Sequence, residues 1–305
     1  MIPMYWWEGY HGLQTVMRRI SHGKKPYVFN FGDQLSPLVV SLLSGQRIQH
    51  STSSYKLLAL GSIFFSLRDH DIVWGSGLIK PSHVAFAASR KMVKYAAVRG
   101  PKTRDILISH GIDCPEIYGD PALLLPSLIK NDVEKRYTIG LVPHFYHYDA
   151  FKEKLGNKYN FKLIDVERPY DAVVRDILSC EIILSSSLHG LIIGEAYGIP
   201  SLLLTMGEPS QDDVFKFEDY FHGTKRSLKF VNFSRIHNLN QLANIALSST
   251  ELLSYNTNPL LSSFPFPRNE AAHISAPGWN SSDFTSWIFK SSVRPPQWYI
   301  PAKFH

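Results

Sequence analysis

His189 lies in the segment SSSLHG, whose residue types and spacing suggest chemistry. The preceding run EIILS reads as a buried strand, and the following run LHGLIIGEAYG reads as a buried helix. The start of a helix exposes free backbone N–H groups and the positive end of a dipole, and both attract anions. We expect His189 to act on an anion bound there, the alternative being a core histidine bonded to the backbone. Glu195, farther along the helix, is expected to hydrogen-bond a sugar hydroxyl or to cap a turn.

Polar residues also follow the ends of other predicted strands. In an open parallel sheet, ligands bind beyond the carboxyl ends of the strands. Each such residue taken alone is a turn or cap residue, but polar groups at six strand ends together indicate a site. The residues are Asn30 and Asp33 after YVFN, Ser76 after DIVWG, Arg99 after YAAV, Asp120 after EIYG, His144 after GLVP and His189 after IILSSS.

The motifs of the first half offer groups for a substrate and for its anionic part. Gly32 permits a tight turn with a close backbone approach, and Asp33 is expected to act on a substrate hydroxyl or to cap the next helix. Ser76 and Gly77 of WGSGL are expected to form an anion cradle of backbone N–H groups. The guanidinium fork of Arg99 suits a carboxylate or phosphate, with a surface salt bridge as the equal alternative.

The segment PHFYHYD raises the question of a metal site. It places His144 three residues before His147, with Asp149 close by. Close histidine pairs occur in zinc sites. No predicted helix carries this pair, however, and further ligands are not obvious. We therefore favour a contact between His144 and an anion or the acceptor, and we predict no metal and no other cofactor.

Short apolar strands alternate with helices, which predicts an α/β fold with parallel sheets. The predicted strands are 26–33, 56–64, 71–78, 94–100, 116–121, 138–143, 161–166, 181–185 and 200–205, and the predicted helices are 35–45, 101–111, 149–156, 170–179 and 188–198.

Chain length and composition predict two domains and a tail. A chain of 305 residues is longer than one core usually holds. We expect Rossmann-like domains over 1–130 and 131–255, with the boundary near 126–134. Residues 256–305 are rich in Pro, Ser and aromatic residues. They are expected to pack on the body and to include a helix near 281–291.

Charge and cysteine content limit the class of protein. The net charge is +6 without a long Lys/Arg run, which favours an anionic small-molecule substrate over nucleic acid. The cysteines are Cys114 and Cys180, too few for a disulfide framework. No secretory signal or apolar run of membrane-spanning length is recognisable. We expect a cytoplasmic protein, with peripheral contact at the inner face of the membrane as the minority alternative.

Taken in order, the motifs resemble those of the polysaccharide pyruvyl transferase family. The similar segments are NFGDQLSP, DIVWGSGL, AAVRGPKTRDIL, YGDPALLLP, IGLVPHFYHYD and SSSLHGLIIGEAYGIPSLLL, which together cover roughly residues 26–205. The form of NFGDQLSP is similar to the bacterial exopolysaccharide type of ketal-pyruvyl transferase.

The resemblance implies a GT-B-like pair of Rossmann-like domains with the active site between them. It also implies phosphoenolpyruvate as the donor and a hexose of a glycan or lipid-linked oligosaccharide as the acceptor. The family residues for donor binding correspond to Arg99 and to the pair Leu188 and His189. Many members carry Arg directly before Leu-His-Gly, where this chain has Ser187. The candidate replacements for that cation are Lys102, Arg104 and Arg168.

The expected reaction assigns roles to two residues. His189 as imidazolium is expected to protonate the donor, and Asp33 is expected to take the proton of a sugar hydroxyl. Two other functions remain open at this stage. One is a nucleotide-sugar glycosyltransferase that uses Glu195 on the ribose, and the other is a non-catalytic glycan-assembly protein. Release of phosphate from phosphoenolpyruvate separates the expected reaction from both.

Overall fold

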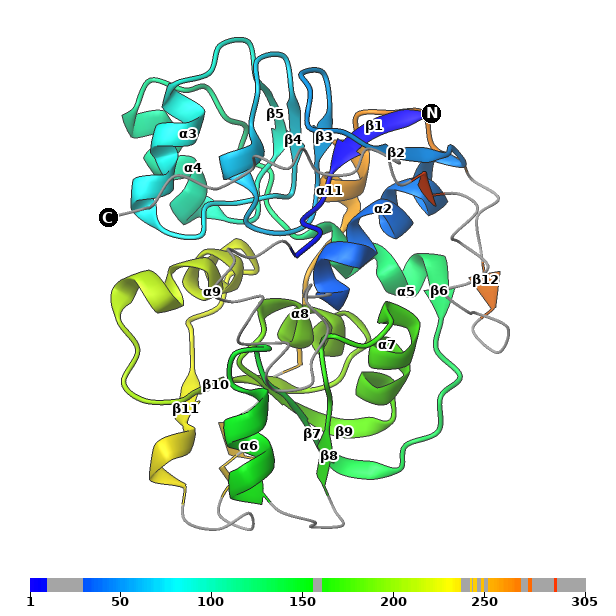
Figure 1. Ribbon diagram of the computed structural model, residues 1–305, viewed down its shortest axis with the longest axis vertical. Coiled ribbons are helices and arrows are strands. Elements are labelled where there is room, and N and C mark those ends of the chain that lie inside the picture. The colour runs from blue at the N-terminus through cyan, green and yellow to red at the C-terminus, as the bar shows by residue number, and fades with distance from the viewer. Residues whose placement is uncertain are drawn as a thin grey trace, which may run out of the picture.

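Two sheets of parallel strands, one in each half of the chain, form the framework of the protein (Figure 1). The computed structural model describes residues 1–9, 30–155, 161–236 and 252–269, together with 242, 244–245, 248–249, 274–275 and 288–289. Helices lie against the sheets and between them, which confirms the predicted α/β, GT-B-like class.

Over the described residues, the sheet of the first half has six strands in the order β13-β2-β1-β3-β4-β5, with β13 contributed by the C-terminal segment. Its strands are β1 (Ile2–Tyr5), β2 (Ile48–His50), β3 (Leu57–Leu58), β4 (Ile72–Trp74), β5 (Lys94–Ala97) and β13 (Ile288–Phe289). The helices of this half are α2 (Phe31–Ser44), α3 (Val84–Ala88), α4 (Pro101–Ser109) and α5 (Leu125–Leu128), with 3-10 turns η1 (Phe64–Ser66), η2 (Pro81–His83) and η3 (Pro121–Leu124). Because β1 pairs with both β2 and β3, the strand order reverses at β1.

The sheet of the second half has five strands in the order β11-β10-β9-β7-β8. Its strands are β7 (Tyr137–Val142), β8 (Phe161–Leu163), β9 (Cys180–Ser185), β10 (Ser201–Thr205) and β11 (Phe230–Asn232). The helices are α6 (Tyr148–Leu155), α7 (Tyr170–Leu178), α8 (Leu188–Ala196), α9 (Gln211–Gly223) and α11 (Asn258–Ser262), with the 3-10 turn η4 (Phe233–Arg235). A small pair joins β6 (Ile129–Lys130) to β12 (Ile274–Ser275). Here the order reverses at β7, between β8 and β9.

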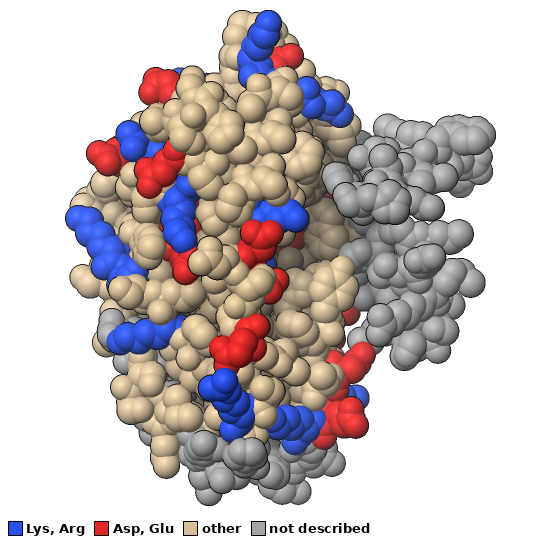
Figure 2. Space-filling view, turned by 90° about the vertical axis from the view of Figure 1, so that its left-hand side faces the viewer, with Lys and Arg blue, Asp and Glu red and all other residues tan. Residues whose placement is uncertain are grey.

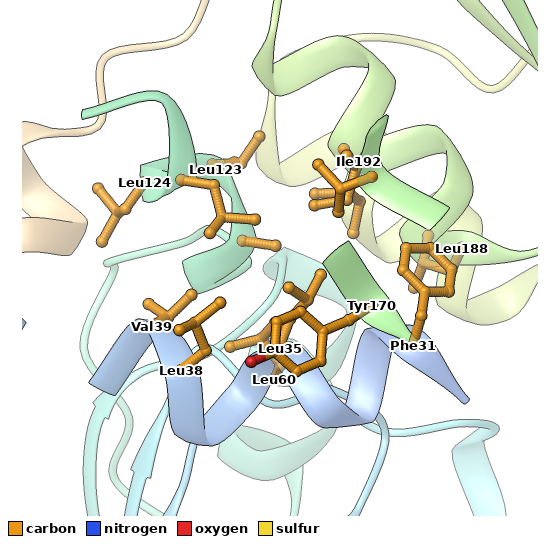
Figure 3. Packing of buried hydrophobic residues seen from close by; sticks show 14 of the residues in the cluster. Phe31, Leu35, Leu38, Val39, Leu60, Leu123, Leu124, Tyr170, Leu188 and Ile192 are labelled. Atoms are coloured by element: carbon orange, nitrogen blue, oxygen red, sulfur yellow. The ribbon is translucent and has the colours of Figure 1, made fainter. Parts of the chain in front are cut away.

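The largest core cluster runs through both halves. Helix α2 packs against η3 and α7, and η3 packs against α8. Figure 3 shows Phe31 and Leu35 of α2 facing Tyr170, Leu188 and other buried residues of the second half. These contacts fix the first turn of α2 relative to the first turn of α8, the two places where the predicted acid and base lie.

The structure differs from the sequence predictions at several elements. Of the predicted strand 26–33, residues 26–29 lie outside the described residues, and Phe31–Asp33 already belong to α2 because Asn30 caps that helix. The segment EIYGDP forms only an isolated bridge between Val98 and Tyr118, because Asp120 caps η3. Strands β1 and β2 and helices α3 and α9 were not predicted.

The C-terminal segment is described only in parts. Trp74 Nε1 donates a hydrogen bond to Leu260 O at 3.0 Å, and the rings of Trp74 and Phe264 lie 4.8 Å apart, so α11 contacts the first sheet. Of the predicted helix near 281–291, Ile288 and Phe289 form β13 and the rest lies outside the described residues. The division into domains stays a prediction.

Three further observations concern the surface charges, membrane-spanning helices and the cysteines. On the face that carries α4 and α9, acidic and basic side chains are interspersed rather than gathered by sign (Figure 2). Over the part of the chain that the structure describes, no helix has the length and apolar character needed to cross a membrane. Cys114 and Cys180 are both buried and not bonded to each other.

Candidate functional site

The loops that follow β1 and β7, the strands at which the order reverses, lie against each other, since the rings of Trp7 and Phe145 stack with their centres 6.2 Å apart. In doubly wound sheets the crevice at such a point is where ligands bind. In the second sheet it opens between the loop after β7, which carries His144, and the loop after β9, which leads to His189. In the first sheet it lies beside α2, whose first turn carries Asp33. The site is therefore built from the two halves together.

His189 and Asp120 form the most unusual pair at this place. His189 Nε2 lies 3.6 Å from Asp120 Oδ2, and both atoms are buried without a hydrogen-bond partner. The other oxygen of Asp120 accepts a hydrogen bond from the N–H of Ala122 at 2.9 Å and so caps η3. Buried polar atoms are normally bonded. The unpaired atoms of this pair are therefore an exception to that rule, and such exceptions are candidates for a functional role.

Gly32 brings α2 directly against the histidine. A Cβ atom at Gly32 would lie 2.0 Å from His189 Nδ1, so no other residue fits at this position without displacing the ring. Asn30 holds the turn, since its Oδ1 accepts a hydrogen bond from the N–H of Gly32 at 3.2 Å. The predicted close backbone approach at Gly32 serves the contact with His189.

Asp33 follows in the same turn and is 7% exposed. Burial raises its pKa from 3.8 to about 6, although the charges of His189 and Lys216 lower it. Gly61 lies in the left-handed region of backbone space, at a φ of 95°, and a Cβ there would be 3.0 Å from Asp33 Oδ1. A carboxylate whose pKa is near neutrality is suited to general-base catalysis.

A pocket of about 290 Å³ opens at the carboxyl ends of β7, β9 and β10. Its polar wall includes His144 and His147 after β7, Ser186 after β9 and Lys216 on α9. The loop from Thr205 to Pro209 and the first turns of α9 close the other side. Asp33, Asp120 and His189 are not among the residues that line this pocket. The charge of Lys216 nevertheless lowers the pKa of Asp33, so Lys216 and Asp33 interact electrostatically.

The two histidines of the pocket are tied to Ser186. Its Oγ accepts a hydrogen bond from the N–H of His144 at 2.8 Å and lies 3.4 Å from His147 Nδ1. Burial lowers the pKa of His144 to about 3 and lowers that of His147, and the charge of Lys216 adds to both effects. Both imidazoles are therefore neutral at neutral pH. Among the described residues, no group of three or more His, Cys, Asp or Glu side chains could hold a metal ion.

Both terminal nitrogens of Arg99 contact protein groups, whereas its Nε is buried without a hydrogen-bond partner. Its Nη2 lies 2.9 Å from Asp219 Oδ2 and donates to Leu78 O at 2.5 Å, while Nη1 donates to Ser62 Oγ at 2.6 Å. Asp219 also accepts hydrogen bonds from the N–H and hydroxyl of Thr103, at 2.8 and 2.7 Å. This buried cluster attaches α9 to α4. We therefore assign Arg99 a structural role in place of the predicted contact with the donor.

The variant Arg99→Lys tests this structural role. Lysine keeps the charge but loses the planar fork that reaches three partners at once. We expect a loss of about 1–3 kcal/mol in the free energy of unfolding, because hydrogen bonds to charged buried groups are lost. Urea denaturation measures the loss, and a ligand titration at a temperature where the variant is folded should show nearly unchanged donor affinity. Unchanged stability with weakened donor binding would return Arg99 to the binding site.

Ser76, Gly77 and Glu195 are also bonded within the protein. Ser76 Oγ donates to Gly61 O at 2.7 Å and the N–H of Gly77 donates to the same oxygen at 3.3 Å, so WGSGL offers no free anion cradle there. Glu195 accepts both arms of Arg226, at 2.7 and 2.8 Å, and the hydroxyl of Tyr220 at 2.6 Å. Its carboxylate holds α8 to α9 rather than meeting a sugar.

The remaining residues predicted to bind the substrate are Ser187 and Leu188. Ser187 is the N-cap residue of α8 but its side chain makes no capping bond, and Leu188 is part of the core. The three cations considered as replacements for the missing arginine are bonded to other groups of the protein. Lys102 pairs with Glu218, Arg104 Nε donates to Cys114 O at 3.0 Å, and Arg168 pairs with Asp176 at 2.5 Å.

The sequence predictions missed Lys216 and Ser186 and gave His147 no role except in a metal site. A local signal for α9 is present in the sequence. Ser210 and Asp213 have the spacing of a capping box, and the structure forms it, with both reciprocal hydrogen bonds in place. Recognising that helix would have placed Lys216 two turns from its start, near the carboxyl end of β10.

Comparison with known proteins gives two matches. The model of the family described as polysaccharide pyruvyl transferase matches residues 15–207. An uncharacterized protein of Acanthamoeba polyphaga mimivirus is 31% identical over 168 residues, which cover 53% of this chain and 57% of the viral protein. The aligned part of the chain thus spans little more than half the length of that relative.

Proposed function

The chain belongs to the polysaccharide pyruvyl transferase family, and on this basis we propose that it transfers pyruvate from phosphoenolpyruvate to two hydroxyls of a hexose. The product is a ketal on an exopolysaccharide or lipid-linked oligosaccharide, and phosphate is released. The observation that carries this proposal is the meeting of Asp33, Asp120 and His189 where the reversal points of both sheets face each other.

His189 is the proposed general acid. Phosphoenolpyruvate becomes an acceptor for a hydroxyl when C3 is protonated, because C2 then gains oxocarbenium character. The carboxylate of Asp120 lies 3.6 Å from Nε2 and is the acidic group that faces this histidine. Gly32 fixes the ring from the other side by close contact.

Asp33 is the proposed general base. It takes the proton of the first sugar hydroxyl as that oxygen bonds to C2. The bond between C2 and the phosphate oxygen then breaks, and phosphate leaves with the bonding electrons. The second hydroxyl oxygen closes the ketal, and its proton goes to the phosphate. Asp33 then returns the proton of the first hydroxyl to His189, whose own proton went to C3. In net terms one hydroxyl proton ends on C3 and one on phosphate, and both residues regain their starting states.

The rival glycosyltransferase function depends on Glu195 as a ligand of the nucleotide ribose. Arg226 and Tyr220 already occupy both oxygens of that carboxylate. The proposed pyruvyl transfer needs no nucleotide and places no demand on Glu195. Two free, buried cysteines support the proposed cytoplasmic location.

Phosphoenolpyruvate is expected to raise the melting temperature of the protein. A ligand that binds only the native state stabilises it by about 2.7 kcal/mol at a hundred times its Kd. Differential scanning fluorimetry measures the shift, and phosphate release in the presence of a glycan acceptor measures turnover. EDTA is expected to change neither. No shift at millimolar donor, or turnover that chelation abolishes and Zn²⁺ restores, would contradict the proposed metal-free reaction.

A further inference from the structure

The phosphate of the proposed donor requires a cation that the predicted residues do not supply. Ser187 stands where many family members carry arginine. Arg99 is bonded to Asp219, and Lys102 and Arg168 pair with acidic residues away from the pocket. A phosphate monoester carries nearly two negative charges at neutral pH. The pocket must therefore hold this charge with another group.

Lys216 is the unpaired cation of the pocket. Among the described residues it makes no hydrogen bond or ion pair, and its ammonium lies 5.2 Å from the centre of the Phe217 ring. The two carboxylates of the pocket wall are already engaged. Asp213 accepts hydrogen bonds from Ser210 in the capping box, and Glu208 pairs with Arg235 at 2.6 Å.

The neighbouring groups suit a phosphate. Ser186 Oγ and the two neutral histidines line the same pocket as Lys216 and offer hydrogen-bond donors. Ser187, the N-cap residue of α8, makes no side-chain capping bond, so the first N–H groups of that helix are not satisfied by their cap. Asp219 anchors helix α9 to Arg99 and to Thr103 of α4, and so positions the backbone that carries Lys216.

We propose that Lys216 binds the phosphate of the donor in this pocket, in place of the arginine that Ser187 replaces. This inference rests on the proposed function, because it assigns one end of the proposed donor. The charges of Lys216 and His189 both lower the pKa of Asp33, and the same proposal places the rest of the donor toward Asp33 and His189. Lys216 is a binding residue here, and it exchanges no proton with the reacting carbons.

Lys216 gives the binding a pH signature. Burial and the positive charge of Arg99 lower its pKa from 10.5 to about 8, so the ammonium loses its proton above that pH. Donor affinity should therefore fall as pH rises through about 8, whereas the phosphate has already lost its second proton near pH 6. The groups that face Lys216 are Arg99, Asp33, Asp213, Glu208, His144 and His147.

Isothermal titration with phosphoenolpyruvate and with inorganic phosphate tests the inference on four proteins. These are the wild type, Lys216→Met, Lys216→Arg and the control Lys152→Met, which removes an exposed lysine of α6. Lys216→Met should weaken both ligands by about 10–100-fold, the value of a charge-assisted hydrogen bond. Lys216→Arg should keep binding and lose the decline above pH 8, and Lys152→Met should match the wild type.

The outcomes separate the inference from the proposed function. If the wild type binds phosphoenolpyruvate and Lys216→Met binds it equally well, the inference is overturned while the function stands. If the wild type binds inorganic phosphate through Lys216 but shows no turnover with phosphoenolpyruvate, the phosphate site stands and the function fails. Absence of binding of either ligand to folded wild type overturns both. The melting temperature of Lys216→Met should not fall, since it loses a costly partly buried charge.

Discussion

Replacing His189 with glutamine is expected to lower kcat by about 10²–10⁴-fold, the usual contribution of a general acid. Glutamine keeps the approximate size of imidazole and can donate a hydrogen bond to Asp120, so the fold should persist. It cannot donate a proton to C3 of the donor. Donor affinity should fall less than kcat, because Lys216 and the start of α8 hold the phosphate in the proposed arrangement.

The melting temperature and kcat must be measured on the same purified His189→Gln sample. His222→Gln is the matched control, because His222 is exposed in the last turn of α9. If His189 is instead a packing residue, the variant will be less stable but nearly as active per folded molecule. That result would remove His189 from the mechanism and make His144 the next residue to test.

Replacing Asp33 with asparagine is expected to lower kcat by about 10²–10⁴-fold. The same replacement should preserve or raise the free energy of unfolding. The carboxylate has a pKa of about 6 because burial penalises its charge. Each pKa unit corresponds to about 1.4 kcal/mol. Ionised Asp33 therefore costs the native state on the order of 3 kcal/mol at neutral pH, a cost that the neutral amide avoids.

The sign of the pH dependence follows from the same shift. The native state holds the Asp33 proton more tightly than the unfolded chain, so this group destabilises the wild type increasingly as pH rises from about 4 to about 6. The stability difference between Asp33→Asn and wild type should grow over that window and then stay constant. Asp132→Asn, at an exposed site, should show no such difference.

The kcat/KM of the wild type should rise with pH near the pKa of Asp33, whereas its stability falls there. A general base works only when ionised, so the kcat/KM of the wild type should fall as pH drops below about 6. The proposed loss of the Lys216 charge supplies the decline above about pH 8. A profile that is flat between pH 5 and pH 7, on protein that stays folded, would contradict Asp33 as the base.

The sequence alone predicted the second sheet and the buried trio of the site. Strands 138–143 and 181–185 are short apolar runs bounded by polar turns, and buried parallel strands have that pattern. Asp33 and Asp120 follow predicted strands of the first half, and His189 follows a strand of the second half. Sequence pattern indicated each strand end, but the packing of η3 against α2 and α8 is what brings the three residues together.

Partners that lie far away in the chain could not be predicted. Arg99 and Glu195 have the types and positions of binding residues, yet Asp219 and Arg226 use their charges. The position of a charged residue at a strand end or on a helix does not show whether a distant part of the chain supplies an oppositely charged partner. The same reason hid Lys216, whose importance depends on Asp213 and Glu208 of the pocket wall being engaged by Ser210 and Arg235 rather than on any motif.

The measurement that tests pyruvyl transfer most directly follows the pyruvate itself. Purified protein is incubated with ¹³C-labelled phosphoenolpyruvate and with glycans and lipid-linked oligosaccharides from cells that lack it, and the products are analysed by mass spectrometry. We predict a labelled pyruvate ketal on a hexose, one phosphate released per ketal, and neither product with His189→Gln. No labelled ketal with any acceptor, from protein shown to be folded, or transfer of a sugar from a nucleotide sugar instead, would contradict the account.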